Sequence, residues 1–248
     1  MIETIKIYLN IYQQLIEKFI EKEQLSIQQK DLIFKSLATQ VDIDMLSKFE
    51  TLNQVEIPIE YKRFLTEIGN GTGDTWESAG IGPDLGILKV IFHKDQCLIL
   101  GDILIDLQTP FPFVDAYNLE NWEELAEQFN QWLEKYNTEF RDKLFQRIEP
   151  TTEEFERFIQ HHGENPRDQY YENFELNGIL PICGIGCGEY YFLVITGPSK
   201  GEIWIDSRDL WGGIAPILDE SGSRQKFDSW YFNWLKAEVL HLQNKLKI

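Results

Sequence analysis

The residues that could bind a metal are few. Cys183 and Cys187 flank three residues, and the third cysteine, Cys97, is far away in the sequence. A structural zinc site needs four ligands, usually in two short-spaced pairs, and His161 and His162 would complete one only by a coincidence of folding. Three cysteines also form no disulfide framework. We therefore expect no metal and interpret the thiols as small side chains buried beside tight turns.

Two glycine clusters could hold phosphate groups, but neither has the required context. Gly184, Gly186 and Gly188 precede residues 189–195, Glu-Tyr-Tyr-Phe-Leu-Val-Ile, which have the composition of a strand. A dinucleotide-binding fingerprint opens a helix instead. The cluster at 69–74 follows a predicted helix and lacks the Gly-Lys-Ser/Thr ending of a phosphate loop. We predict tight turns at both places and no bound nucleotide or other cofactor.

Carboxylates and tryptophans make a glycoside hydrolase the strongest enzymatic alternative. Such enzymes hold two carboxylates roughly 5–10 Å apart, and aromatic side chains often line the sugar groove. With 41 acidic residues, some pair meets that distance by accident, and the tryptophans at helical spacing are better interpreted as core: Trp122, Trp132, Trp230 and Trp234. No His is arranged with Ser or Cys in a familiar nucleophile motif. We assign no catalytic residue and expect no enzymatic activity.

The net charge of −18 constrains the partner. Residues 115–127 hold five acids and no Lys or Arg, and residues 149–156 hold four acids and no base. The electrostatic field of this charge repels nucleic acid and anionic lipid and attracts basic proteins. The alternative explanation of the charge is that it only keeps the protein soluble. No apolar run approaches the ~18 residues of a membrane span, and the first six residues lack signal-peptide features. These observations predict a cytoplasmic protein that binds neither nucleic acid nor membrane.

Hydrophobic spacing in the N-terminal half predicts helices followed by strands. Apolar residues recur every three or four positions from Ile2 to Phe19, and further helices are expected around 28–38 and from an N-cap at Asp42. Pro58 suits the first turn of another helix, which glycines end near position 70. Strand composition follows at 86–92 and 98–105, where Gly101-Asp102 indicates a turn or bulge.

The C-terminal half predicts a second helical region and then a hairpin. A long helix is expected from about 118 to 144, and Thr151 with Glu154 fits the capping box of a short one. Residues 161–177 are polar and indicate a loop. Strand-like runs then follow, two of them joined by five residues that begin and end in Gly, and a last helix is expected from about 228.

Several of these motifs, taken in order, resemble the SUKH superfamily, which includes yeast cell-wall synthesis regulators and many bacterial proteins. The resemblance spans roughly residues 55 to 240 and leaves the first 50 uncovered. It is carried by IPIEYKRFL with GNG (57–71), PFPF (110–113), GILPI (178–182), GCG (186–188), LVITG (193–197), Gly201 with WID (204–206), GIAP (213–216) and Phe227 with WY (230–231) and WL (234–235).

The resemblance implies an α+β fold, with a mostly antiparallel, curved β-sheet flanked by helices. We expect residues 1–52 to form a helical extension packed on the main domain, and residues 53–248 to form a SUKH-like domain with a helical insertion near 118–160. The resemblance also implies that the protein is an immunity protein, which neutralises a cognate bacterial toxin, often a nuclease, by direct binding. The alternative is a regulatory adaptor that binds endogenous proteins.

The acidic charge fits a basic toxin domain as the partner, and the sequence leaves the oligomeric state open. We expect the contact residues among charged or aromatic residues of loops and turns, because a few such anchors carry most binding energy. The candidates are Trp76, Glu77, Glu189, Asp206, Asp209 and Trp211.

Overall fold

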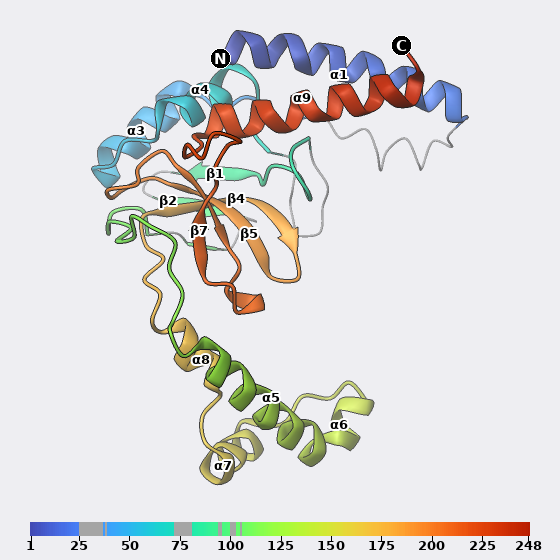
Figure 1. Ribbon diagram of the computed structural model, residues 1–248. Helices are drawn as coiled ribbons and strands as arrows, with labels where there is room; N and C mark the ends of the chain where they lie inside the picture. The colour runs from blue at the N-terminus through green and yellow to red at the C-terminus, as the bar shows by residue number, and fades with distance from the viewer. Residues whose placement is uncertain (25–36, 38, 72–80, 94–95, 100–102, 105) are drawn as a thin grey trace.

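The computed structural model of the chain describes residues 1–24, 37, 39–71, 81–93, 96–99, 103–104 and 106–248. Helices flank two antiparallel sheets, so the predicted α+β class is confirmed. Figure 1 shows two long helices on one side of the sheets and a group of shorter helices projecting on the opposite side. Within the described residues, none of the helices combines the length and apolar character needed to cross a membrane.

The larger sheet has four strands that are adjacent in sequence order. Each pairs antiparallel with the next, and their bounds are β4 Ile179–Gly186, β5 Glu189–Val194, β6 Ile203–Asp206 and β7 Ile214–Pro216. The β4–β5 turn places Cys187 and Gly188 at φ of 51° and 83°, the left-handed pair that a tight hairpin turn requires. The first glycine cluster therefore forms a hairpin, as the strand-like residues after it predict.

The smaller sheet has three antiparallel strands, β1 (Val90–His93), β2 (Gln96–Ile99) and β3 (Ile103–Leu104). Just before β1, Ile87 bridges Cys183, and the Leu88 N–H donates to the carbonyl of Ile182 at 2.8 Å. This contact joins the chain that leads into the smaller sheet to β4 of the larger one. The turn expected at Gly101-Asp102 lies outside the described residues.

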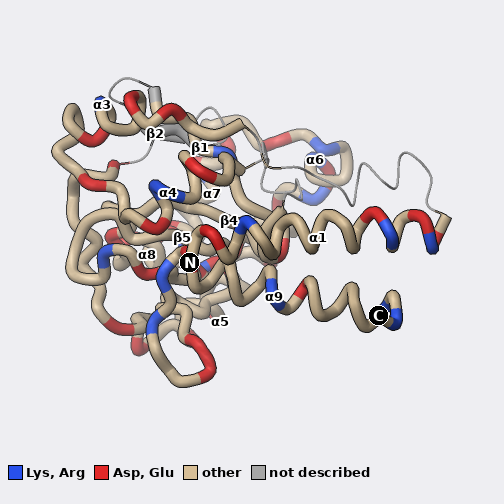
Figure 2. The backbone as a smooth tube through the Cα atoms, turned by 90° about the horizontal axis from the view of Figure 1, so that it is seen from above, with Lys and Arg blue, Asp and Glu red and all other residues tan. Residues whose placement is uncertain are grey.

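Helices α1 (Ile2–Glu23) and α9 (Phe227–Leu246) lie side by side and run in the same direction (Figures 1 and 2). Tyr8 contacts Phe232, with ring centroids 5.1 Å apart, and one turn further on Tyr12 lies 6.0 Å from Trp234. Four residues of the predicted stripe are buried: Ile2, Ile5, Leu9 and Ile16. Leu15 and Ile20 are buried as well, whereas Tyr12 and Phe19 are half-buried. The first turns of α1 share the main hydrophobic core with the sheets.

Helices α3 (Ile43–Asn53) and α4 (Ile59–Glu67) begin as the sequence predicts. The Asp42 carboxylate accepts from the Asp44 N–H at 2.7 Å, and Pro58 precedes the first turn of α4. Phe64 of α4 is fully buried and packs edge-on against Phe227 and Tyr231, with centroids 4.9 Å away in both cases. This aromatic group ties α4 to α9.

The projecting helices form an insertion between the two sheets in sequence, which we define as residues 118–176. Its helices are α5 Trp122–Glu139, α6 Arg141–Phe145, α7 Thr152–His162 and α8 Pro166–Tyr171. The predicted capping box at the start of α7 is confirmed, because Thr151 and Glu154 bond reciprocally.

The prediction of a loop over residues 161–177 is wrong, because this segment contains α8. Asn165 caps the helix by accepting from the Arg167 N–H at 3.0 Å, and Pro166 occupies its first turn. The helix is only six residues long and buries Tyr170 alone, so it has no hydrophobic stripe that a periodicity argument would detect.

Candidate protein-binding site

The buried ion pair of Asp206 and Arg208 organises the end of the larger sheet that faces the insertion. Asp206 ends β6 and is only 2% exposed. Its Oδ2 accepts from Nη2 of Arg208 at 2.7 Å and its Oδ1 accepts from Nε at 2.9 Å. Burial by itself lowers the pKa of Arg208, but the hydrogen bonds and charge of Asp206 outweigh it, so the pKa is raised and the guanidinium remains charged.

Arg208 connects the ion pair to α8. Its Cζ lies 4.7 Å from the ring centroid of Tyr171, a cation–π contact across to the insertion. The Tyr171 hydroxyl donates to Asp209 Oδ1, and burial is the main reason why the pKa of Tyr171 is raised. Asp206 therefore positions Arg208 inside the protein and has almost no surface to offer a partner.

Arg167 and Trp211 form a second connection between insertion and sheet. Trp211 follows the short 3-10 helix η1 (Arg208–Leu210) in a left-handed conformation and packs against Tyr170, with centroids 4.8 Å apart. The Arg167 guanidinium carbon lies 4.6 Å above the Phe129 ring and 5.4 Å from that of Trp211. Arg167 Nη2 also donates to the Asp209 carbonyl at 2.8 Å. These contacts hold α5 and α8 against η1.

The structure thus brings three of the sequence-predicted site residues together: Asp206, Asp209 and Trp211. Glu189 begins β5, next to Gly188, whose backbone is in contact with the Asp209 carboxylate. Trp76 and Glu77 lie outside the described residues. The placement of Asp206, Asp209 and Trp211 assigns them to the attachment of the insertion, a role that sequence spacing did not indicate.

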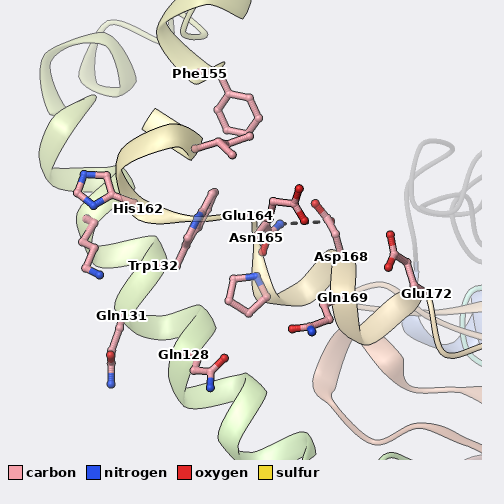
Figure 3. Close-up of a pocket in the computed structure, with 13 residues that line it drawn as sticks. Gln128, Gln131, Trp132, Phe155, His162, Glu164, Asn165, Asp168, Gln169 and Glu172 are labelled. Carbon is pink, nitrogen blue, oxygen red and sulfur yellow. Dashed lines mark hydrogen bonds between the residues drawn. The ribbon is translucent and has the colours of Figure 1, made fainter. Parts of the chain in front are cut away.

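A groove of about 760 Å³ lies within the insertion, between α5, α7 and α8. Glu164, Asp168 and Glu172 line the side formed by α8 and the loop before it, and α5 forms the opposite side (Figure 3). Trp132 lies between them and is 7% exposed; its indole Nε1 donates to the Gly163 carbonyl at 3.0 Å. The groove falls within the size range of ligand-binding clefts.

Sequence reasoning missed these groove residues. Glu164, Asp168 and Glu172 recur at four-residue spacing, but only Asp168 lies within α8, which Glu164 precedes and Glu172 follows. Their place on one side of the groove therefore depends on how α8 packs against α5, which the spacing alone does not show. Trp132, expected in the core, is buried as predicted and also lines the groove.

The insertion also concentrates negative charge. Residues 118–176 are less than a quarter of the chain, yet their 15 Asp and Glu and six Lys and Arg give −9, half of the total of −18. In the rest of the chain the remaining 26 acidic residues exceed the 17 basic ones as well, and Figure 2 shows charged residues of both signs along the backbone. Among the described residues, only Glu139 and Glu154 of these 15 acids have an ion-pair partner, His162 and Lys143 respectively.

The positions of the cysteine thiols bear on whether the chain could bind a metal ion. Cys183 is buried and donates to the Pro83 carbonyl, as expected, but Cys187 is exposed at the tip of the β4–β5 turn, so the prediction of a buried thiol is wrong there. Within the part of the chain that the structure describes, His, Cys, Asp and Glu form no group able to hold a metal ion.

Carboxyl groups with clearly shifted pKa values do not resemble general acids. The pKa of Glu154 is lowered to about 2, first by the hydrogen bond from Lys143, and that of Glu67 is lowered to about 2, first by the bond from Arg63. A general acid of a glycosidase needs a raised pKa. Both shifts are those of ion-paired surface groups.

Comparison with known proteins adds no relative to this picture. No family model matches the chain, and neither the curated proteins nor the solved structures searched contain a match. The geometry of the insertion is therefore the basis for a functional proposal.

Proposed function

We propose that this protein is a non-enzymatic inhibitor that binds a basic protein, in the manner of an immunity protein that neutralises a cognate bacterial toxin. The observation that carries the proposal is the insertion, where half of the net charge is gathered on a projecting group of helices. The resemblance of residues 55–240 to the SUKH superfamily supports the same assignment. Cytoplasmic location remains part of this proposal.

Electrostatics explains how such an inhibitor works. An enzyme that cleaves nucleic acid has a basic cleft, because it must hold phosphate groups. A surface of carboxylates competes for that cleft and also accelerates encounter, with association rates of roughly 10⁸–10⁹ M⁻¹s⁻¹ at low salt. Since all but two of the insertion's carboxylates have no ion-pair partner among the described residues, their charge is available to a partner.

Co-expression with the toxin encoded beside this gene tests the proposal. We expect host cells to survive only when the inhibitor is present, and the purified proteins to form a complex whose association slows as salt is raised. Unprotected cells together with no complex would overturn the proposal. Protection lost on deleting an endogenous binding partner of the host would favour the regulatory adaptor instead.

A further inference from the structure

We infer that the groove between α5, α7 and α8 receives an extended segment of the partner protein that carries Lys or Arg side chains. The inference rests on the proposed function, because it names the part of the basic partner that the insertion binds. Four features of the groove support it: its size, its acidic side, its free amides and its rigid base.

The size of the groove suits a short peptide segment. Its volume of about 760 Å³ lies in the upper part of the range of ligand sites, roughly 300–1,000 Å³. The lining is predominantly polar, with side chains from three helices converging on one space (Figure 3). A cleft of this kind accommodates a polar chain and does not suit a purely apolar ligand.

The charges of the groove are unevenly distributed. Glu164, Asp168 and Glu172 line one side, and none of them has an ion-pair partner among the described residues; Asp168 accepts only from the Asn165 amide at 3.3 Å. The basic side chains of the lining, Lys135 and His162, lie on α5 and α7 across the groove. An occupant that fits both sides presents basic side chains to α8 and an acceptor, such as a main-chain carbonyl, to Lys135.

Side-chain amides supply the partners that a peptide backbone needs. Gln131 of α5 and Gln169 of α8 line the groove, and neither side-chain amide has a hydrogen-bond partner among the described residues. An amide can donate to a backbone carbonyl and accept from a backbone N–H at once. These groups favour a polypeptide over an isolated cation.

The base of the groove is held rigidly, so little ordering is needed when a ligand binds. Trp132 stacks on Tyr136 with centroids 5.4 Å apart, and it meets Phe158 edge-on at 5.2 Å. Its hydrogen bond to Gly163 fixes the chain at the end of α7. The contacts of Arg167 then fix α8 to the sheet.

The test uses the full chain and two labelled nine-residue peptides, one of alternating Lys and Ser and one of alternating Glu and Ser, followed by fluorescence anisotropy. We expect only the Lys peptide to bind. The groove variant Glu164→Gln/Asp168→Asn/Glu172→Gln should weaken binding at least tenfold, about 1.4 kcal/mol. The matched variant Glu17→Gln/Glu21→Gln/Glu23→Gln removes the same charge from exposed positions of α1 and should change affinity less than threefold.

A variant that changes the shape of the groove but not its charge distinguishes binding in the groove from attraction by the overall negative charge. Gln169→Trp fills the groove and should weaken the Lys peptide as strongly as the triple variant, provided circular dichroism shows an unchanged fold. Equal losses in both triple variants would mean that binding follows net charge alone and would overturn the inference, as would no binding of the Lys peptide.

Different results would refute the proposed function and the assignment of the groove as the binding site. If the groove variant still protects cells from the toxin, the groove is not the contact, although inhibition stands. If wild-type protein binds the Lys peptide through the groove but gives no protection, the site is confirmed and the assignment as an inhibitor of that toxin is wrong.

Discussion

Replacing Asp206 by Asn removes one charge of the buried ion pair while keeping its shape. The asparagine side chain would retain Oδ1, so the backbone N–H of Arg208, which donates to that atom at 3.0 Å, keeps an acceptor. The guanidinium, however, would be left without its counter-charge, although only 13% of the Arg208 side chain is exposed. The substitution therefore isolates the electrostatic contribution of the carboxylate.

The expected loss is about 3 kcal/mol in the free energy of unfolding, at the low end of the roughly 3–5 kcal/mol measured when one partner of a buried pair is removed. The low end applies because the contact with Tyr171, at 4.7 Å, still stabilises the cation. At about 2–4 °C per kcal/mol for a chain of this size, Tm should fall by roughly 6–12 °C. Urea denaturation followed by circular dichroism, with thermal melting beside it, measures both quantities.

The double variant Asp206→Leu/Arg208→Met is the matched control. Replacing both charges by apolar groups removes the uncompensated cation, so it should be more stable than Asp206→Asn alone. The loss in Asp206→Asn should also persist in high salt, since a buried pair is poorly screened. A loss below about 0.5 kcal/mol, the usual scale for surface substitutions, would refute the argument that this pair is buried and unsupported by solvent.

Three further predictions concern the core, a turn and the insertion. Phe64→Ala should cost about 3–5 kcal/mol in denaturant unfolding, because the side chain is fully buried. Gly213→Ala should cost roughly 1–3 kcal/mol in the same assay, since φ is +68° and a Cβ would lie 2.2 Å from the carbonyl oxygen of Tyr117. The pKa of Glu154 is lowered from 4.5 to about 2 in the folded protein, so its carboxylate stabilises the folded state fully above pH 4.5, and this contribution is lost as the pH falls towards 2. In Glu154→Gln, the free energy of unfolding should therefore decrease less steeply between pH 4.5 and pH 2, measured by urea denaturation at each pH.

Local signals in the sequence are sufficient for most of the regular elements. The apolar stripe of α1, the N-cap at Asp42 and the capping box at Thr151 all depend on residues within one or two turns of each other. The hairpin between β5 and β6 likewise follows from its turn residues. Such features are determined by neighbours in the chain, so their chemistry is visible in the sequence.

The candidate site depends on contacts that are distant in the sequence. Asp206 and Arg208 are only two residues apart, but the burial of their ion pair depends on the packing of Arg208 against Tyr171 of α8, and no local pattern encodes that packing. The β4–β5 turn combines both situations: the sequence predicts the turn itself, but not that the thiol of Cys187 in the turn is exposed. The groove requires α8, whose six residues are too few for a periodic signal.

Three cations in or beside the insertion are engaged in contacts within the protein. Arg167 stacks on Phe129 and Trp211, and Arg208 is paired with Asp206, so both guanidinium groups are engaged by the attachment of the insertion to the sheet. Lys143 pairs with Glu154 within the insertion. Arg167 and Lys143, two of the six Lys and Arg of the insertion, are thus engaged in internal contacts, whereas 13 of its 15 carboxylates have no ion-pair partner among the described residues. A partner approaching the insertion therefore meets a field set mainly by carboxylates, and this division of roles links the fold of the insertion to the charge of the protein it would bind.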